Sequence, residues 1–510
     1  MLREADGPLE ASIFVEALRA APAALVACGL VAHALLWAVA THFADPSPSP
    51  QMAIAIALGR ETLLGYPELP PLAAWLSDAI YRATHSLFAI RLAAASCIAL
   101  AGWFVFLFAR RVAGDRQAAI AVLMMVSVYP VAFPGGALTG DLLQMPLLAG
   151  AVLCWWIAVG EKNPAAWMPL GLLLAVSVYA GPQGVVLFAV LVIVTLLSAH
   201  ARSATGNLTA LFAILVALLI LAHVAGPRAI WLYFHGAENL FADDRAETSA
   251  SEASTLLRIP LVIALGHFGF ALLIVLATFD TAKARESAPV FARQSSAPFS
   301  RRSVIAIAIV PALLACAWVL LDGQVVRAQF FAPLLLFGGL AAVLIGGERL
   351  ILRRQALVGS IALILLFVPP VMHVALSFAP GWFGDNRATN WPAAQAARIF
   401  TEIFQTRTGR PLAFVAGDRI PAAQIAAVAS TRPRFVSDAD LSRSPWIDAT
   451  EFKAKGGVVF WEIRGADSAP PAQLAAKFPA LVIEAPLRLS WARGGGEPVR
   501  LGWAIVPPAP

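Results

Sequence analysis

Apolar runs long enough to cross a bilayer recur along this chain and constrain its fold more than any other feature. A membrane-spanning helix needs about twenty predominantly apolar residues. With 59% hydrophobic and 13% charged residues among 510, the chain carries more apolar surface than one aqueous core can bury. We therefore expect an α-helical polytopic membrane protein. The sequence predicts about eleven spans, at residues 23–40, 90–109, 117–134, 142–160, 166–180, 184–199, 207–225, 258–279, 303–321, 330–347 and 356–378.

Basic residues between the spans predict the orientation. With the spans above, most Lys and Arg of the short loops fall on one side of the membrane, and such an excess marks the cytoplasmic side. Merging the fifth and sixth spans, which meet at Gly181 and Pro182, would divide the basic clusters between both sides, so the bias supports separate spans. The clusters lie at residues 110–116, 162, 202, 283–302 and 349–354.

The same topology predicts the domain organisation. Residues 1–21 form a cytoplasmic segment, residues 22–378 a transmembrane domain with a first outer loop at 43–89, and residues 379–510 a domain outside the cytoplasm. In this last region short apolar runs alternate with turn-like and helical stretches, which is typical of a small α/β domain. The predicted strands cover 412–415, 434–436 and 457–461, and a helix is predicted at 393–404.

The first outer loop contains a predicted helix at residues 51–64. Apolar residues share this stretch with Gln51, Arg60 and Glu61. The pattern indicates an amphipathic helix that lies in the membrane interface, with its apolar side toward lipid.

Short motifs along the chain resemble one known family when they are taken in order. They are Gly65-Tyr66, Pro70-Pro71-Leu72, Ala74-Trp75-Leu76, Arg91-Leu92, Ala109-Arg110-Arg111, Thr139-Gly140-Asp141, Gly181-Pro182, Asn390-Trp391-Pro392, Pro411-Leu412, Val415-Ala416-Gly417-Asp418 and Ser444-Pro445-Trp446-Ile447-Asp448. Through these motifs the chain resembles family 39 glycosyltransferases. These are membrane-embedded C-type enzymes related to protein O-mannosyltransferases and to the lipid A aminoarabinose transferase.

The resemblance implies a C-type glycosyltransferase fold at a bacterial inner membrane, with the C-terminal domain in the periplasm. It implies transfer of a glycosyl group from a polyprenyl-phosphate donor to a lipid, polysaccharide or protein acceptor at the periplasmic face. A phosphate leaving group needs little protonation, so such a site mainly requires a carboxylate to take the acceptor's proton and cations to stabilise the phosphate. The sequence does not specify which sugar or which acceptor is used.

Neither a cofactor nor a nucleic-acid partner is expected. The Lys and Arg residues form short clusters between apolar runs, which is a membrane-topology pattern, and the histidines lack metal-ligand spacing. The acidic residues Asp243, Asp244 and Glu247 are interpreted as a solvated loop face, and they leave a divalent cation open.

The chain departs from the family pattern at the expected catalytic position. The family's catalytic Asp aligns with Gln51, and Leu69 stands where a basic residue precedes the double proline. A neutral amide cannot act as a general base. An alternative is therefore a non-catalytic relative that binds polyprenyl-linked sugar or scaffolds an envelope glycan machinery. A transporter or flippase fits less well, because the spans are nearly free of charge and no internal repeat is evident.

Asp141 is the leading candidate for a catalytic residue, because a carboxylate between two apolar spans is costly to retain and matches the family motif. The alternative is that Asp141 caps the helix before Leu142. Asp45 and Gln51 complete the catalytic candidates. Asp45 has the alternative role of ending the first span at the membrane interface.

Five further residues are candidates for substrate binding. Arg91 and Arg327 would contact phosphate or act as interfacial anchors, and Glu61 would contact substrate or form the solvated edge of its helix. The complete set is Arg91, Glu61, Tyr66, Glu68 and Arg327. The topology predicts a cavity between the first loop and the loop bearing Asp141, with the C-terminal domain as its roof.

Overall fold

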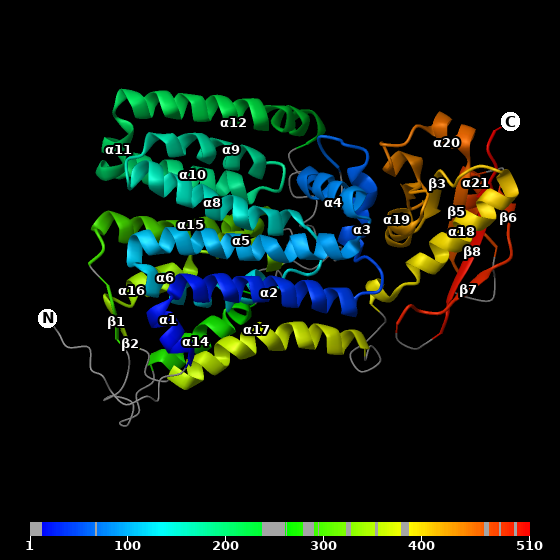
Figure 1. Ribbon diagram of the computed structural model, residues 1–510. Coiled ribbons are helices and arrows are strands. Elements are labelled where there is room, and N and C mark those ends of the chain that lie inside the picture. The colour runs from blue at the N-terminus through cyan, green and yellow to red at the C-terminus, as the bar shows by residue number, and fades with distance from the viewer. Residues whose placement is uncertain are drawn as a thin grey trace.

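A helical bundle forms most of the molecule, and a smaller sheet-bearing domain lies against one end of it (Figure 1). The computed structural model describes residues 13–66, 69–236, 261, 263–278, 290–293, 295–322, 328–351, 355–378, 387–463, 469–478, 481–493 and 497–509.

The bundle is built from apolar helices that run along one common direction (Figure 1). The helix α8 lies at its centre, because 83% of its most apolar window is buried, against 22% for α12 and 17% for α17. The helices α2 and α5, α5 and α8, and α8 and α9 pack as neighbours. The bundle helices are α1 (Ile13–Ala20), α2 (Pro22–Ala44), α5 (Leu87–Ala113), α6 (Asp115–Val126), α7 (Tyr129–Ala132), α8 (Gly140–Val159), η1 (Pro164–Ala166), α9 (Trp167–Ser177), α10 (Gln183–Leu197), α11 (Ala199–Thr205), α12 (Leu208–His235), α14 (Phe268–Thr278), α15 (Pro298–Asp322), η4 (Ala328–Leu334), α16 (Gly338–Ile345) and α17 (Gln355–Phe378).

The structure supports a multi-pass membrane protein, but the count of about eleven spans is not confirmed. In the part of the chain that the structure describes, six helices are long and apolar enough to cross a membrane, or seven if α10 and α11, bent by 97°, are one span. Three predicted spans are instead short helices. The run at 117–134 breaks before Pro130, the run at 166–180 contains α9 of 11 residues, and the run at 330–347 contains η4 and α16 of 8 residues. Hydropathy alone does not register the Pro and Gly residues that interrupt a helix.

The C-terminal domain contains a six-stranded mixed sheet, as the prediction of a small α/β domain requires. Its strands follow the order β4-β3-β5-β8-β6, and β7 pairs with β8. The strands β4, β3 and β5 are parallel, and the others pair antiparallel with β8. The elements are η6 (Ala388–Asn390), α18 (Ala393–Thr408), β3 (Phe414–Gly417), α19 (Arg419–Val428), β4 (Arg434–Ser437), η7 (Leu441–Arg443), α20 (Ala449–Lys455), β5 (Gly457–Glu462), α21 (Ala472–Lys477), β6 (Val482–Ile483), β7 (Leu487–Leu489) and β8 (Val499–Val506). The three predicted strands and the predicted helix are all present.

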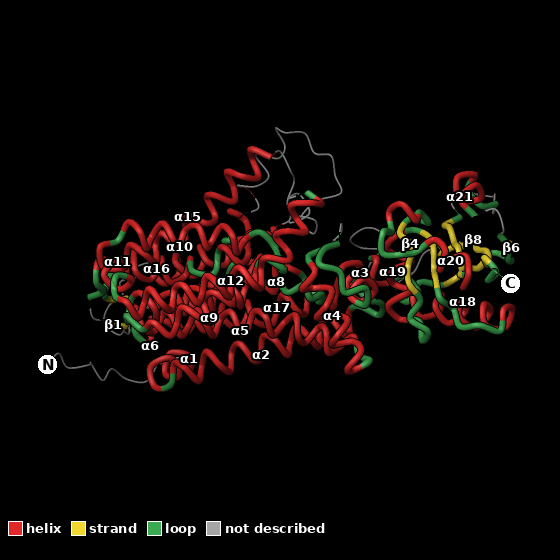
Figure 2. Tube along the Cα trace, turned by 90° about the horizontal axis from the view of Figure 1, so that it is seen from above, coloured by secondary structure: helices red, strands yellow, loops and turns green. Residues whose placement is uncertain are grey.

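The first outer loop forms two helices, α3 (Pro50–Gly59) and α4 (Pro71–Thr84). The prediction of an amphipathic interfacial helix is wrong, because Met52 through Gly59 are all buried. The helix α3 packs between α4 and α19 of the C-terminal domain, and Figure 2 shows α3 beside α19. The polar residues Arg60 and Glu61 follow the end of α3, so they do not form a polar side of that helix.

A short antiparallel strand pair, β1 (Val290–Ala292) with β2 (Arg349–Ile351), lies at the opposite end of the bundle (Figure 1).

Candidate functional site

A cavity of about 190 Å³ lies between the first loop and the start of α8. Gln51 lines it from α3, Asp141 from α8 and Gln329 from η4. Apolar walls come from residues such as Phe133 and Met145. The described lining residues all belong to the bundle and the first loop. The described part of the C-terminal domain packs on α3 and does not roof this cavity.

Asp141 is positioned by the first turn of α8. The side chain of Thr139 accepts a hydrogen bond from the Leu142 amide, so Thr139 is the N-cap and the alternative capping role of Asp141 is not observed. Asp141 is buried, and its Oδ1 accepts a 2.7 Å hydrogen bond from Nε2 of Gln183. The Gln183 amide also donates to the Phe330 carbonyl at 3.3 Å. A carboxylate at the N-terminus of a helix is favoured by the helix dipole.

The turn between α9 and α10 fixes the start of α8. The Gln144 side chain donates to the carbonyl oxygens of Ser177 at 2.8 Å and of Gly181 at 2.9 Å. Gly140 packs so closely against the Ala180 carbonyl that any side chain at position 140 would collide with it. The Gly181-Pro182 turn thus lies directly against the helix that bears Asp141.

Gln51 lies in the first turn of α3, behind the N-cap Ser49, whose side chain accepts a hydrogen bond from Met52. Its side chain is exposed and lines the cavity together with Asp141. The structure therefore brings two of the three predicted catalytic residues to one cavity.

Asp45 and Arg91 form a separate polar cluster at the end of α2. The Oδ2 atom of Asp45 lies 3.3 Å from Nε2 of His373 on α17. Arg91 donates to the Asp45 carbonyl at 2.7 Å, and its Nη1 lies 3.2 Å from Nδ1 of His42. Neither Asp45 nor Arg91 lines the Asp141 cavity. The ring of Phe133, which does, lies 5.9 Å from the ring of His373, so this cluster lies behind an apolar wall of the cavity.

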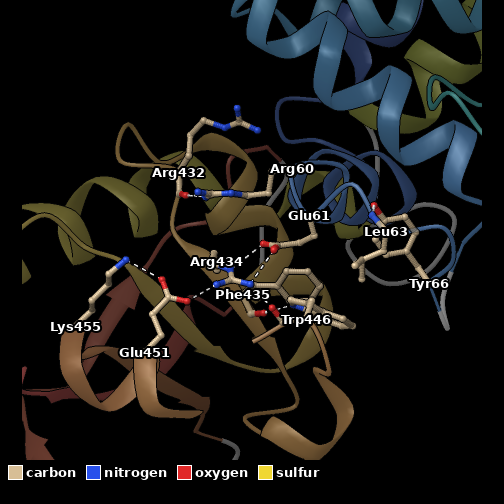
Figure 3. A network of polar contacts seen from close by, with 10 residues as sticks. All are labelled: Arg60, Glu61, Leu63, Tyr66, Arg432, Arg434, Phe435, Trp446, Glu451 and Lys455. Atoms are coloured by element: carbon tan, nitrogen blue, oxygen red, sulfur yellow. Dashed lines mark hydrogen bonds and ion pairs between the residues drawn. The ribbon is translucent and has the colours of Figure 1, made fainter. Parts of the chain in front are cut away.

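Glu61 lies at the junction with the C-terminal domain, and Tyr66 lies further along the same loop beside Leu63 (Figure 3). Both Glu61 oxygens accept 2.8 Å hydrogen bonds from Arg434, which also contacts Glu451 at 2.6 Å. The Tyr66 hydroxyl accepts a 3.0 Å hydrogen bond from the Leu63 amide, and burial raises the pKa of Tyr66 to about 12. Neither residue lines the Asp141 cavity.

The remaining candidates fall on residues that the structure does not describe. Glu68, Arg327 and the acidic residues Asp243, Asp244 and Glu247 lie outside the described residues. Within those that are described, no three His, Cys, Asp or Glu side chains come together as metal ligands would.

Three polar residues near the site were not among the predicted candidates: Gln144, Gln183 and Arg228. The two glutamines fix the surroundings of Asp141, and the buried Arg228 of α12 donates to the Leu64 carbonyl of the first loop at 2.8 Å. One available signal was the presence of polar side chains inside or beside apolar spans, where an unpaired polar group is costly.

Comparison with known proteins relates the chain to membrane glycosyltransferases. Residues 68–231 match the family model described as dolichyl-phosphate-mannose-protein mannosyltransferase. That segment contains Asp141, Gln144 and Gln183, and it begins after Gln51. No curated protein matches the sequence.

Solved structures with a similar fold include ArnT from Cupriavidus metallidurans bound to undecaprenyl phosphate. It is 15% identical with a TM-score of 0.55, and the similarity covers 94% of this chain and 98% of that one. An oligosaccharyltransferase from Archaeoglobus fulgidus, in complex with Zn and sulfate, is 13% identical with a TM-score of 0.44 over 92% of this chain and 72% of that one. The chain thus has the C-type glycosyltransferase fold, and its resemblance to family 39 glycosyltransferases is confirmed.

Proposed function

We propose that this protein transfers a glycosyl group from a polyprenyl-phosphate donor to an acceptor, at the end of the bundle that adjoins the C-terminal domain. The observation that supports this most directly is the cavity shared by the buried Asp141 and by Gln51. The mannosyltransferase family match includes Asp141, and a protein of similar fold binds undecaprenyl phosphate. The excess of basic residues at the other end of the bundle supports a site on the side of the membrane away from the cytoplasm, which the family resemblance makes the periplasmic face of a bacterial inner membrane.

In this proposal Asp141 accepts the proton of the acceptor hydroxyl or stabilises positive charge that develops on the sugar. Its Oδ1 is already oriented by Gln183, and fixed partners of this kind reduce the reorganisation that the reaction requires. Gln51 donates or accepts hydrogen bonds beside it and orients a substrate, since an amide does not take up a proton. Arg327 remains a proposed phosphate contact. Arg91 would contact phosphate only if the donor extends to the separate cluster at the end of α2, because Arg91 does not line this cavity.

Replacing Asp141 tests the proposal. We expect Asp141→Asn to lower the rate of sugar transfer from a polyprenyl-phosphate sugar by about a hundredfold or more, as the loss of a positioned base does. Asp448→Asn is the matched control, because Asp448 is an exposed N-cap of α20 and Asn caps a helix equally well. Unchanged transfer by Asp141→Asn in an active preparation would exclude this cavity as the reaction site.

A second candidate function is favoured by the amide at position 51. If the protein only binds polyprenyl-linked sugar, the purified chain will show saturable binding of the donor without turnover. In that case Gln51→Asp will leave the protein inactive, whereas an impaired enzyme gains activity from the restored carboxylate.

A further inference from the structure

A second cavity, of about 590 Å³, lies at the end of the bundle remote from the C-terminal domain. It is an open cavity, lined by the last turn of α5, the first turn of α6 and the segment between β1 and α15. Figure 1 shows these elements at the end opposite α18 and the sheet. This cavity shares no described lining residue with the Asp141 cavity.

Arginines dominate the polar lining of this cavity. Arg110, Arg111, Arg116 and Arg293 line it together with the hydroxyl-bearing Ser295 and Ser296, and the described lining residues include one acidic side chain, Asp115. Arg110 binds Asp115 through Nε at 3.1 Å and Nη2 at 3.2 Å. Arg111 is paired with Glu161, which lies outside the lining, at 2.9 Å. With Arg116 and Arg293 also in the lining, positive charge still exceeds negative charge there.

Buried hydrogen bonds connect the walls of the cavity. Gln117 is 1% exposed and donates to the carbonyl oxygens of Phe291 at 2.9 Å and of Glu348 at 3.3 Å. The Arg293 amide donates to the same Glu348 carbonyl at 2.9 Å, and its Nη1 donates to Ser296 Oγ at 3.1 Å. The first turn of α6 is thereby connected to the strand pair, so the arginines surround a defined space.

We propose that this cavity binds a phosphate group. Guanidinium groups match the geometry of phosphate oxygens and bind them through paired hydrogen bonds. The first turn of α6 has no side-chain cap, and the N-terminus of a helix favours an anion. Basic pockets between spanning helices on the cytoplasmic side suit anionic lipid headgroups. Free phosphate offers the same oxygen atoms, so the experiment must separate the two sources.

The test compares thermal unfolding of the purified full chain in detergent as one ligand is titrated. The ligands are phosphatidylglycerol, phosphatidylcholine and inorganic phosphate, the last at constant ionic strength. We expect phosphatidylglycerol to stabilise the protein and phosphatidylcholine to have little effect. The double variant Arg116→Gln/Arg293→Gln should bind phosphatidylglycerol about thirtyfold more weakly, since each basic residue near a membrane surface contributes about 1 kcal/mol. Arg202→Gln, an exposed residue of α11 outside the lining, is the control and should bind like the wild type.

The outcomes are distinct. Stabilisation by inorganic phosphate alone, lost in the double variant, supports the phosphate site and assigns it to a soluble ligand. If neither phosphatidylglycerol nor phosphate stabilises the protein, or if the double variant responds like the wild type, the proposal is overturned. If the double variant does not fold, Arg116→Gln and Arg293→Gln are measured singly, with an expected weakening of about fivefold each. An equal response of both single variants and the wild type also overturns the proposal.

Discussion

The two walls of the Asp141 cavity are fixed by different kinds of interaction. The first loop is joined to the C-terminal domain by ion pairs, Glu61 with Arg434 and Asp78 with Arg432. The start of α8 is joined to its neighbours by neutral amides, Gln144 to the α9–α10 turn and Gln183 to Asp141 and η4. One wall therefore depends on charges contributed by a separate domain, and the other on hydrogen bonds within the bundle.

This difference follows from the surroundings of each wall. Placing opposite charges deep in an apolar bundle carries a large desolvation cost, whereas an amide hydrogen bond avoids most of it. At the junction, side chains keep partial contact with water, with Arg434 18% and Glu61 13% exposed, so ion pairs are less costly there. We therefore expect a change in the C-terminal domain to affect the position of Gln51 more than that of Asp141.

The largest effect is expected from removing Arg434, which joins the first loop to the C-terminal domain through Glu61. Arg434→Ala leaves Glu61 and Glu451 without their shared partner (Figure 3). We expect a loss of about 2–3 kcal/mol in the free energy of unfolding, near the lower end for broken buried pairs. Thermal or denaturant unfolding in detergent measures it. Arg407→Ala is the matched control, because its pair with Glu484 leaves Arg407 62% exposed, and such pairs contribute about 0–1 kcal/mol. Equal losses in both variants would show that the Glu61–Arg434 pair contributes no more to stability than an exposed surface pair.

An intermediate effect is expected from removing the hydrogen bonds of the Gln183 side chain. Gln183→Leu removes the hydrogen bond to Asp141 and the one to the Phe330 carbonyl. A buried acceptor that loses its donor costs about 1–3 kcal/mol, and we expect about 2 kcal/mol here with little dependence on salt. Gln405→Leu, at an exposed position of α18, controls for the change in side-chain type. A loss that disappears at high salt would show that the Gln183 contacts act mainly through screened charge and not as buried hydrogen bonds.

Local patterns predicted much of the fold. The strands β3, β4 and β5 were predicted because short apolar runs between turn residues are a local signal, and the membrane class followed from apolar runs of sufficient length. Breaks such as the one before Pro130 were missed, since the surrounding residues remain apolar. The burial of α3 was missed as well, because it depends on α19, which lies more than 300 residues further along the chain.

The site was partly predictable for a similar reason. Asp141 is a carboxylate beside an apolar span, so it stands out in the sequence, and the topology placed it on the same side as the first loop. The partner of Glu61 is 373 residues away, and no local pattern relates the two. Gln183 was missed because an amide at the start of an apolar helix differs little from other polar residues at helix ends. The topology predicted where the cavity lies, and its detailed polar contacts required the structure.

The smallest effect is expected from titrating Glu451, which shares Arg434 with Glu61. The hydrogen bond from Lys455 lowers the pKa of Glu451 below its ordinary value, and the charge of Arg434 acts in the same direction. A carboxyl group with a lowered pKa in the folded state stabilises the protein above its unfolded pKa, and this contribution is lost as the pH falls through the folded value. At neutral pH we therefore expect the wild type to exceed Glu451→Gln in stability by less than about 1 kcal/mol, because the group is partly exposed. This difference should shrink toward zero as the pH falls below the ordinary range of a Glu carboxyl group, which thermal unfolding of both proteins across acidic pH will measure. The amides of the other wall do not titrate, so a difference that stayed constant down to the lowest pH would show that Glu451 does not contribute through its charge.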